Sequence, residues 1–277
     1  MTVSKLLEKG KQILSDNNIG NYANEARWIF EVVFNVSSQY LFFNGNDEVN
    51  DEKTEEYIAQ INRRLNGEPV QYIIGSWDFY GEAFRVGEGV LIPRPETELL
   101  IDFATENLKE LENPVVFDLC SGSGCIGLTI ARLFPDSRVY LIEKSEKAFE
   151  YLSENKKLSG CENAYLIKGD IFSGFDSFKL PQPDLILSNP PYIESGEISQ
   201  LQSEVLKEPI MALDGGNDGL DFYRCIAEKW LPYCKKSIAV ECGENQHTEI
   251  AKMLSGMNIN FIKDFNEINR IVCGTKI

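Results

Sequence analysis

Between residues 115 and 188 the sequence alternates short apolar runs of strand length with longer segments that have the apolar spacing of helices. Strands separated by helix-length connections pair in parallel through right-handed crossovers, so this alternation predicts an α/β fold with a parallel sheet. In such a sheet the ligand binds at the carboxyl ends of the strands, and the residues that follow each strand are the first candidates for a site. The expected strands are residues 115–120, 138–143, 164–167 and 183–188, and the expected helices are residues 126–134 and 146–157.

The N-terminal part of the chain has a different pattern. From residue 4 to about residue 65 apolar residues recur at helical spacing, which predicts a small all-helical domain over residues 1–66. Gly67-Glu68-Pro69 breaks this pattern, and residues 67–92 are predicted to form a β-hairpin linker with glycine turns. The β segments expected there are residues 70–75, 77–81 and 83–86.

The remaining residues, 93–277, are expected to form the α/β domain. Helical spacing precedes the first strand of the sheet, and further β patterns follow the last of the alternating strands. The sheet is therefore expected to continue beyond residue 188. These flanking elements are expected helices at residues 96–111 and 222–230, and expected strands at residues 237–242, 259–263 and 270–274.

Charge and cysteine usage limit the classes of partner. The formal charge is −16 at pH 7, which argues against a protein that binds nucleic acid directly by neutralising phosphates. The 7 cysteines form no CxxC pair, so we expect reduced thiols in a cytoplasmic protein. No apolar run approaches the roughly 20 residues of a membrane span, and the N-terminus lacks the apolar core of a signal peptide, so no membrane association is expected.

Asn189-Pro190-Pro191-Tyr192 directly follows the strand expected at residues 183–188. Two successive prolines remove two N–H donors and fix φ, so the carbonyls of Asn189 and Pro190 project from a stiff turn beside an amide oxygen and an aromatic ring. Such a turn can accept hydrogen bonds from a planar NH2 group. An ordinary proline-rich turn is the alternative interpretation.

A glycine-rich loop, residues 118–127, joins the first sheet strand to a helix. It contains GxGxxG from Gly122 to Gly127, and Glu143 lies at the distance expected for a residue that binds a ribose, so a dinucleotide-dependent dehydrogenase is one interpretation. Two acidic residues favour another ligand. Asp118 within the loop suits an ammonium group better than a pyrophosphate, and Asp170 adds a second carboxylate after the third strand. This acidic lining matches S-adenosylmethionine, which carries a positive amine and sulfonium and no phosphate.

Together these residues resemble the class I S-adenosylmethionine-dependent methyltransferases that methylate amino groups. Three further segments narrow the resemblance: Pro93-Arg94-Pro95-Glu96-Thr97-Glu98, Glu208-Pro209 with Ala212-Leu213, and Gly215-Gly216-Asn217-Asp218-Gly219-Leu220. With them the chain resembles, over essentially its whole length, the HemK/PrmC family of protein-(glutamine-N5) methyltransferases. These enzymes modify the Gly-Gly-Gln motif of class I peptide-chain release factors.

The resemblance implies a Rossmann-like, mostly parallel seven-stranded sheet, S-adenosylmethionine as cofactor with S-adenosylhomocysteine as product, and release factors as partners. It implies that Glu143 binds the ribose, that Asp170 lies near the adenine and that Asp118 lies near the methionyl end. Cys120 stands where this class more often has glycine, and Glu143 where aspartate is common. The implied cofactor-binding residues are Asp118, Cys120, Ser121, Gly122, Ser123, Gly124, Glu143, Asp170, Ile171 and Asn189.

For the substrate, the expected acceptors are Asn189 Oδ1 and the Pro190 carbonyl, with Tyr192 packing against the amide plane. These three residues are the predicted catalytic set, and Pro191 joins them in the predicted substrate-binding turn. No metal cluster and no cysteine–histidine nucleophile is expected, and the single histidine, His247, is interpreted as incidental. Docking of a release factor on residues 1–66 rests on the resemblance alone.

Two other functions stay open from the sequence. The Asn-Pro-Pro-Tyr turn can accept hydrogen bonds from an amino group on a nucleic-acid base as well as from an amide NH2 group. The negative charge of the chain counts against a nucleic-acid substrate. The chain could also be a catalytically silent module that holds a translation factor. Retention of both the glycine loop and the acceptor turn disfavours that interpretation.

Overall fold

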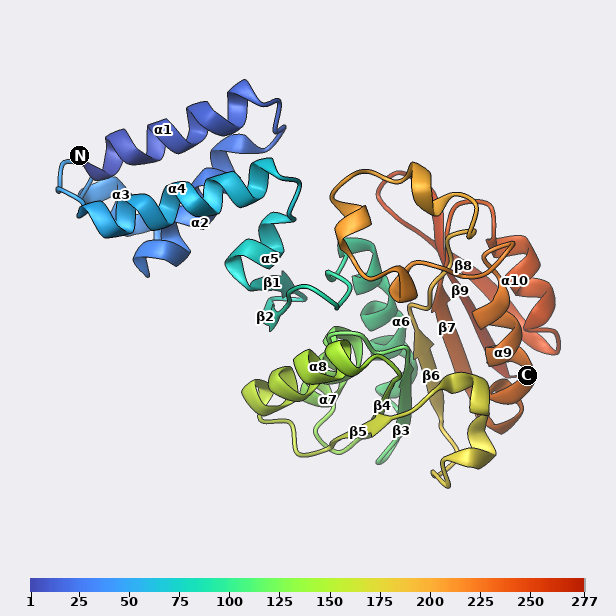
Figure 1. Cartoon of the computed structure of the whole chain (residues 1–277). Coiled ribbons are helices and arrows are strands. Elements are labelled where there is room, and N and C mark those ends of the chain that lie inside the picture. The colour runs from blue at the N-terminus through green and yellow to red at the C-terminus, as the bar shows by residue number, and fades with distance from the viewer. Residues whose placement is uncertain (277) are drawn as a thin grey trace. The chain divides into compact units, whose positions relative to one another are not determined.

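The computed structural model describes residues 1–276. The chain forms two compact units, one built from Met1–Ser76 with Gln202–Lys207 and the other from Trp77–Leu201 with the chain that follows from Glu208 (Figure 1). The first unit contains the helices of the N-terminal part, and the second contains the main sheet. None of the helices within residues 1–276 is long and apolar enough to cross a membrane.

The first unit is helical, as predicted. Its two longest helices begin at polar caps: the Thr2 side chain accepts a hydrogen bond from Lys5 N, and the Asn50 side chain accepts one from Lys53 N. The apolar faces of these helices close over a core that contains Phe30 and Tyr57, both fully buried. The helices are α1 (Val3–Asp16), α2 (Tyr22–Phe34), α3 (Ser38–Phe43), α4 (Asp51–Leu65) and α5 (Val70–Ile74).

Residues 70–75 correct the sequence-based prediction, because they form helix α5 and its cap rather than a β segment. Val70 and Ile73, one helical turn apart, both pack into the helical core, and Gly75 ends the helix with a left-handed φ of 76°. Burial against the other helices overrides the β propensity of this short apolar run. The compact helical unit consequently extends through Ser76 instead of ending at residue 66.

Arg64 explains why a segment from the second half of the chain belongs to the helical unit. Its guanidinium is buried and pairs with Glu25 at 2.6 Å and with Glu204 at 2.5 Å. A buried charge needs partners to offset its lost hydration, so Arg64 holds Glu204 and the surrounding residues Gln202–Lys207 to this unit.

The second unit is built on a seven-stranded sheet with the order β5-β4-β3-β6-β7-β9-β8. Pairing is parallel from β5 through β7, while β9 is antiparallel to both β7 and β8. This confirms the predicted mostly parallel sheet. The strands are β3 (Val115–Leu119), β4 (Arg138–Glu143), β5 (Ala164–Lys168), β6 (Leu185–Ser188), β7 (Ser237–Glu241), β8 (Met257–Lys263) and β9 (Asn269–Lys276), and a separate hairpin holds β1 (Ser76–Phe79) and β2 (Glu82–Arg85).

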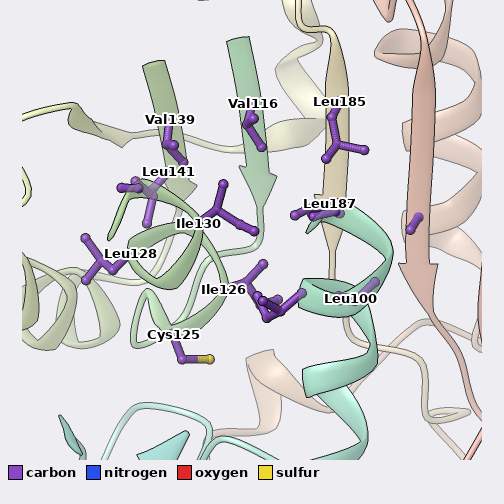
Figure 2. Packing of buried hydrophobic residues seen from close by; sticks show 14 of the residues in the cluster. Leu100, Val116, Cys125, Ile126, Leu128, Ile130, Val139, Leu141, Leu185 and Leu187 are labelled. Atoms are coloured by element: carbon purple, nitrogen blue, oxygen red, sulfur yellow. The ribbon is translucent and has the colours of Figure 1, made fainter. Parts of the chain in front are cut away.

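Helices cover both faces of this sheet and enclose two apolar cores. On one face, Val116 and Leu187 of the strands pack against Leu100, Ile126 and Ile130 of the helices (Figure 2). On the other, Phe117 faces a core that includes Trp230 and residues of α9 and α10. The helices are α6 (Glu98–Leu108), α7 (Cys125–Leu133), α8 (Glu146–Ser159), α9 (Asp221–Lys229) and α10 (His247–Met253). Short 3-10 helices of this unit lie at Pro95–Thr97, Ile171–Ser173, Phe175–Ser177, Ile198–Gln200, Ile210–Ala212 and Leu231–Tyr233, and one more, Val205–Lys207, belongs to the first unit.

Candidate active site

An open cavity of about 960 Å³ lies at the carboxyl ends of β3, β4, β5 and β6. Its place is the one where parallel sheets bind their ligands. Segments outside these strand ends complete the wall, including residues 89–93, Thr97 and residues 209–212.

Most residues predicted from the sequence meet in this cavity. Those in its lining are Cys120, Ser121, Gly122, Ser123, Glu143, Asp170, Ile171, Asn189 and Pro191. Asp118, Gly124, Pro190 and Tyr192 lie outside the lining that the described residues form. The roles predicted for individual residues stay predictions, but the structure shows what each side chain contacts.

The glycine loop opens with three residues in left-handed backbone conformation, namely Cys120 at φ 62°, Gly122 at φ 54° and Gly124 at φ 84°. For an L-residue such as Cys120 this conformation costs roughly 1–2 kcal/mol, which explains why glycine suits the position. At Gly124 space is also limited, since a Cβ would lie 2.3 Å from Leu152 Cδ1. Gly124 thus lets helix α8 approach the loop.

Glu143 ties the glycine loop to the end of β4. Its carboxylate is 8% exposed and accepts hydrogen bonds from Gly122 N at 2.8 Å and from Ser145 N at 2.6 Å. Burial raises the pKa of this carboxyl, and the hydrogen bonds from backbone N–H groups lower it only in part. Each carboxylate oxygen keeps lone-pair capacity for a ligand hydroxyl.

Asp170 lies across the cavity lining beside Lys144. One carboxylate oxygen accepts from Phe172 N at 2.9 Å, and the other lies 2.9 Å from Lys144 Nζ. Partial burial raises the pKa of Asp170, but the hydrogen bonds from Lys144 and Phe172 N outweigh it, and the pKa is lowered. Lys144 is the one cationic side chain among the described lining residues, and it is already paired. The lining therefore suits a cationic ligand without phosphate groups, and the residues present fit S-adenosylmethionine.

Asp118 has a different position from the one expected. It is fully buried beneath the loop, where Oδ2 accepts from Gly127 N at 2.9 Å and Oδ1 has no hydrogen-bond partner within residues 1–276. Burial raises its pKa to about 7. A Cβ on Gly127 would lie 2.5 Å from Leu141 Cδ2, so this glycine permits close packing rather than ligand approach. Asp118 is placed to anchor α7, not to contact a methionyl amine directly.

The turn after β6 presents Asn189 to the cavity. Asn189 Nδ2 donates to Thr97 Oγ1 at 3.1 Å, which leaves Oδ1 as the amide's free acceptor. The ring of Tyr192 packs against the second core, and its burial raises the pKa of the phenol. Its backbone carbonyl accepts from Gln246 Nε2 at 2.8 Å. The ring is thus placed to support the turn, and because Tyr192 is only partly buried its packing against a substrate amide stays a prediction.

Three residues at the site, Thr97, Glu241 and Glu208, have no role that their sequence context predicts. Glu208 is buried, accepts from Ile92 N at 3.0 Å and pairs with Arg94. This contact joins two segments that carry the family resemblance, residues 93–98 and 208–213, and holds Pro209 and Met211 in the cavity wall. The sequence motifs indicate that these two segments matter, but they do not show that the segments contact each other. The contacting residues lie more than a hundred positions apart in the sequence.

The glycine segment 215–220 supports the acceptor turn from behind. A Cβ on Gly215 would lie 2.8 Å from the Pro191 carbonyl oxygen, and one on Gly219 would lie 2.4 Å from the Tyr192 carbonyl oxygen. Ile193 N donates to Leu213 O at 2.9 Å, so the two segments run together. Only glycine lets these backbones come so close.

The fold and the cavity define a methyltransferase: a seven-stranded sheet of this order, a glycine loop after its first central strand, and an Asn-Pro-Pro-Tyr turn. Residues 96–218 match the methyltransferase small domain, and residues 5–75 match the PrmC N-terminal domain. A crystal structure of a methyltransferase from Pyrococcus furiosus has the same fold, with a TM-score of 0.53, 16% identity, and coverage of 80% of this chain and 98% of the other.

Two relatives identify the family. The release factor glutamine methyltransferase of Thermodesulfovibrio yellowstonii is 40% identical over 97% of this chain and 97% of its own length. That of Fusobacterium nucleatum is 35% identical over 98% of this chain and 78% of its own length. The chain therefore belongs to the release factor glutamine methyltransferase family.

We expect Gly215→Ala to lower the free energy of unfolding by about 1–3 kcal/mol, because the added methyl group collides with the backbone of Pro191 and Tyr192. Gly196→Ala is the matched control, since nothing lies within 4 Å of a Cβ there. Both changes restrict the unfolded chain equally, so their difference isolates the collision. Urea unfolding of both variants measures it, and equal stabilities would contradict the close approach.

Asp118→Asn should change how stability depends on pH. Because the folded pKa of Asp118, about 7, lies above its unfolded value, the wild type loses stability as pH rises between these two pKa values. The asparagine variant lacks this loss, so its stability relative to wild type should improve by on the order of 1–4 kcal/mol between about pH 4 and about pH 8. Urea unfolding of both proteins across this range tests it, and a difference that does not vary with pH would contradict the buried acid.

Proposed function

We propose that this enzyme transfers a methyl group from S-adenosylmethionine to the side-chain amide nitrogen of the glutamine in the Gly-Gly-Gln motif of class I peptide-chain release factors. The observation that carries the proposal is Asn189 at the cavity, with its NH2 group bound to Thr97 and its carbonyl oxygen left as an acceptor. The names of relatives that match nearly the whole chain support the substrate.

For the cofactor, the proposal assigns the ribose hydroxyls to Glu143 and the adenine edge to Asp170 and Ile171. All three line the cavity beside Gly122 and Ser123 of the glycine loop. Glu143 suits hydroxyl donors because its two oxygens are fixed by backbone N–H groups and still have free lone pairs. The acidic lining supports a ligand whose methionyl end is positively charged.

The substrate amide is a poor nucleophile because its nitrogen lone pair is delocalised into the carbonyl. Positioning must therefore supply much of the rate. In the proposal Asn189 Oδ1 and the Pro190 carbonyl accept the two N–H bonds of the glutamine, which aims its nitrogen and stabilises the positive charge that develops there. Pro191 forms the adjoining wall, and Tyr192 supports the turn from its buried side.

When bound, S-adenosylmethionine supplies the methyl group: the N–C bond forms as the C–S bond breaks, sulfur keeps the electron pair, and the nitrogen then loses a proton to water. This chemistry needs no strong base from the chain. His247 lies outside the cavity lining and packs edge-on against Phe261, at 5.2 Å between ring centroids.

The helical unit is proposed to dock the release factor, in the cytoplasm where translation factors act. It carries an adjacent pair of aromatic side chains on α3, Phe42 and Phe43, which are 83% and 78% exposed. Large aromatic residues left in solvent are suited to burial in a protein interface. Direct binding of nucleic acid is not part of this proposal, in keeping with the charge of −16.

Radiolabelled S-adenosylmethionine offered with release factor, Gly-Gly-Gln peptide, RNA or DNA tests the proposal directly. We expect label on the two glutamine substrates, and Asn189→Ala should lower that rate by about 10²-fold or more while cofactor affinity stays near wild type. Asn260→Ala, an exposed asparagine on β8, is the control. Labelling of RNA or DNA alone would favour the base-methylating alternative, and no labelling with no cofactor binding would favour a silent module.

Docking is tested by the double variant Phe42→Ser with Phe43→Ser. We expect kcat/KM for intact release factor to fall about 5- to 30-fold, since interface aromatics commonly contribute more than 1 kcal/mol, while methylation of the short peptide stays unchanged. Phe265→Ser is the control, because Phe265 is fully exposed but lies between β8 and β9 of the other unit. Equal loss on both substrates would contradict a docking role.

A further inference from the structure

Glu241, Thr97 and Asn189 form a chain of hydrogen bonds at the edge of the cavity. Thr97 Oγ1 donates to Glu241 Oε2 at 2.5 Å and accepts from Asn189 Nδ2 at 3.1 Å. Thr97 and Glu241 are each 2% exposed. Strands β6 and β7 are parallel with Ser188 opposite Val240, so Asn189 and Glu241 occupy neighbouring positions at the same sheet edge.

The Thr97 side chain does not do what its position in the sequence would predict. It precedes the first residue of α6, where a threonine commonly accepts a hydrogen bond from the helix backbone. Here it makes no such capping bond. Its hydroxyl is instead committed to two residues that lie 92 and 144 positions further along the chain.

The direction of this chain of hydrogen bonds depends on the charge of Glu241. Burial raises the pKa of Glu241 to about 7, so the carboxyl is ionised above that pH. An ionised carboxylate only accepts, and a hydroxyl carries one hydrogen, so the hydrogen of Thr97 then goes to Glu241. The lone pairs that Thr97 turns toward Asn189 can then only accept. The amide group must place its NH2 on that side, and its Oδ1 is left on the other.

We propose that Thr97 and Glu241 are positioning residues that hold the Asn189 amide in this one orientation, so that the site offers an acceptor and selects a substrate nitrogen that bears hydrogens. The inference deepens the proposed function and rests on it. A flipped amide would present NH2 to the NH2 of the substrate, and neither could accept from the other.

A purely structural role is the competing explanation, because the bond between Thr97 and Glu241 also ties the start of α6 to the end of β7. The two roles differ in how they depend on Asn189. If Thr97 acts through Asn189, removing its hydroxyl matters only while the asparagine is present. A structural contact would matter equally in both backgrounds.

The test is a double-mutant cycle of Thr97→Val and Asn189→Ala, with Thr97→Ser as the conservative variant. Single-turnover methylation of a Gly-Gly-Gln peptide with tritiated S-adenosylmethionine gives the rate, and calorimetry gives cofactor affinity and confirms folding. We expect Thr97→Val to lower the rate about 10-fold or more in the wild-type background and less than about 3-fold in the Asn189→Ala background. The rate of Thr97→Ser should stay within about 3-fold of wild type, and in Thr97→Val and Asn189→Ala cofactor affinity should change less than the rate.

Equal rate losses in both backgrounds, or a Thr97→Val enzyme as fast as wild type, would overturn the positioning role while leaving the proposed function intact. A wild-type chain that fails to methylate the peptide and intact release factor would instead overturn the proposed function, and the positioning role with it. If the valine variant does not bind cofactor, Thr97→Ala takes its place in the cycle, because it removes the hydroxyl without adding a branched apolar group.

Discussion

Parallel pairing of β3 with both β4 and β6 is the constraint on which the site depends. Leu119 lies opposite Ile142 on one side and opposite Ser188 on the other, so the residues that follow these three strands emerge at one edge. Backbone N–H groups that leave the sheet there need acceptors. Glu143 supplies them for Gly122 and Ser145, and in doing so fixes the loop that lines the cavity.

The same geometry explains what the sequence could predict. Strand ends can be located from apolar runs, and whatever follows them must meet at the edge, so Glu143, Asp170 and Asn189 were predicted together and do line one cavity. Helix α5 was mispredicted because five residues, Val70–Ile74, are too few to show a helical period, and only packing against the helical core decides their conformation.

Side-chain direction was harder to predict than backbone position. Alternation along β3 places Asp118 on the same face as Val116, under the start of α7, so a carboxylate at the right strand end points away from the cavity. The contacts of Thr97 could not be predicted for another reason. Threonine before a helix predicts a cap, and nothing local signals partners such as Glu241 that are brought close only by the sheet.

Two kinds of hydrogen-bond acceptor lie at this edge of the sheet: the carboxyl groups of acidic side chains and the neutral amide oxygen of Asn189. Asp118, Glu143 and Glu241 are buried acidic side chains, and hydrogen bonds from backbone N–H groups or from the Thr97 hydroxyl offset the cost of their burial only in part, because burial still raises the pKa of all three. In the proposed function the Glu143 carboxylate accepts hydrogen bonds from the ribose hydroxyls of the cationic cofactor. The substrate nitrogen faces the neutral oxygen of Asn189, which accepts an N–H without itself taking up a proton near neutral pH. A neutral acceptor can present the wrong atom, whereas a carboxylate cannot, and this is why an amide in such a position needs neighbours that fix its orientation.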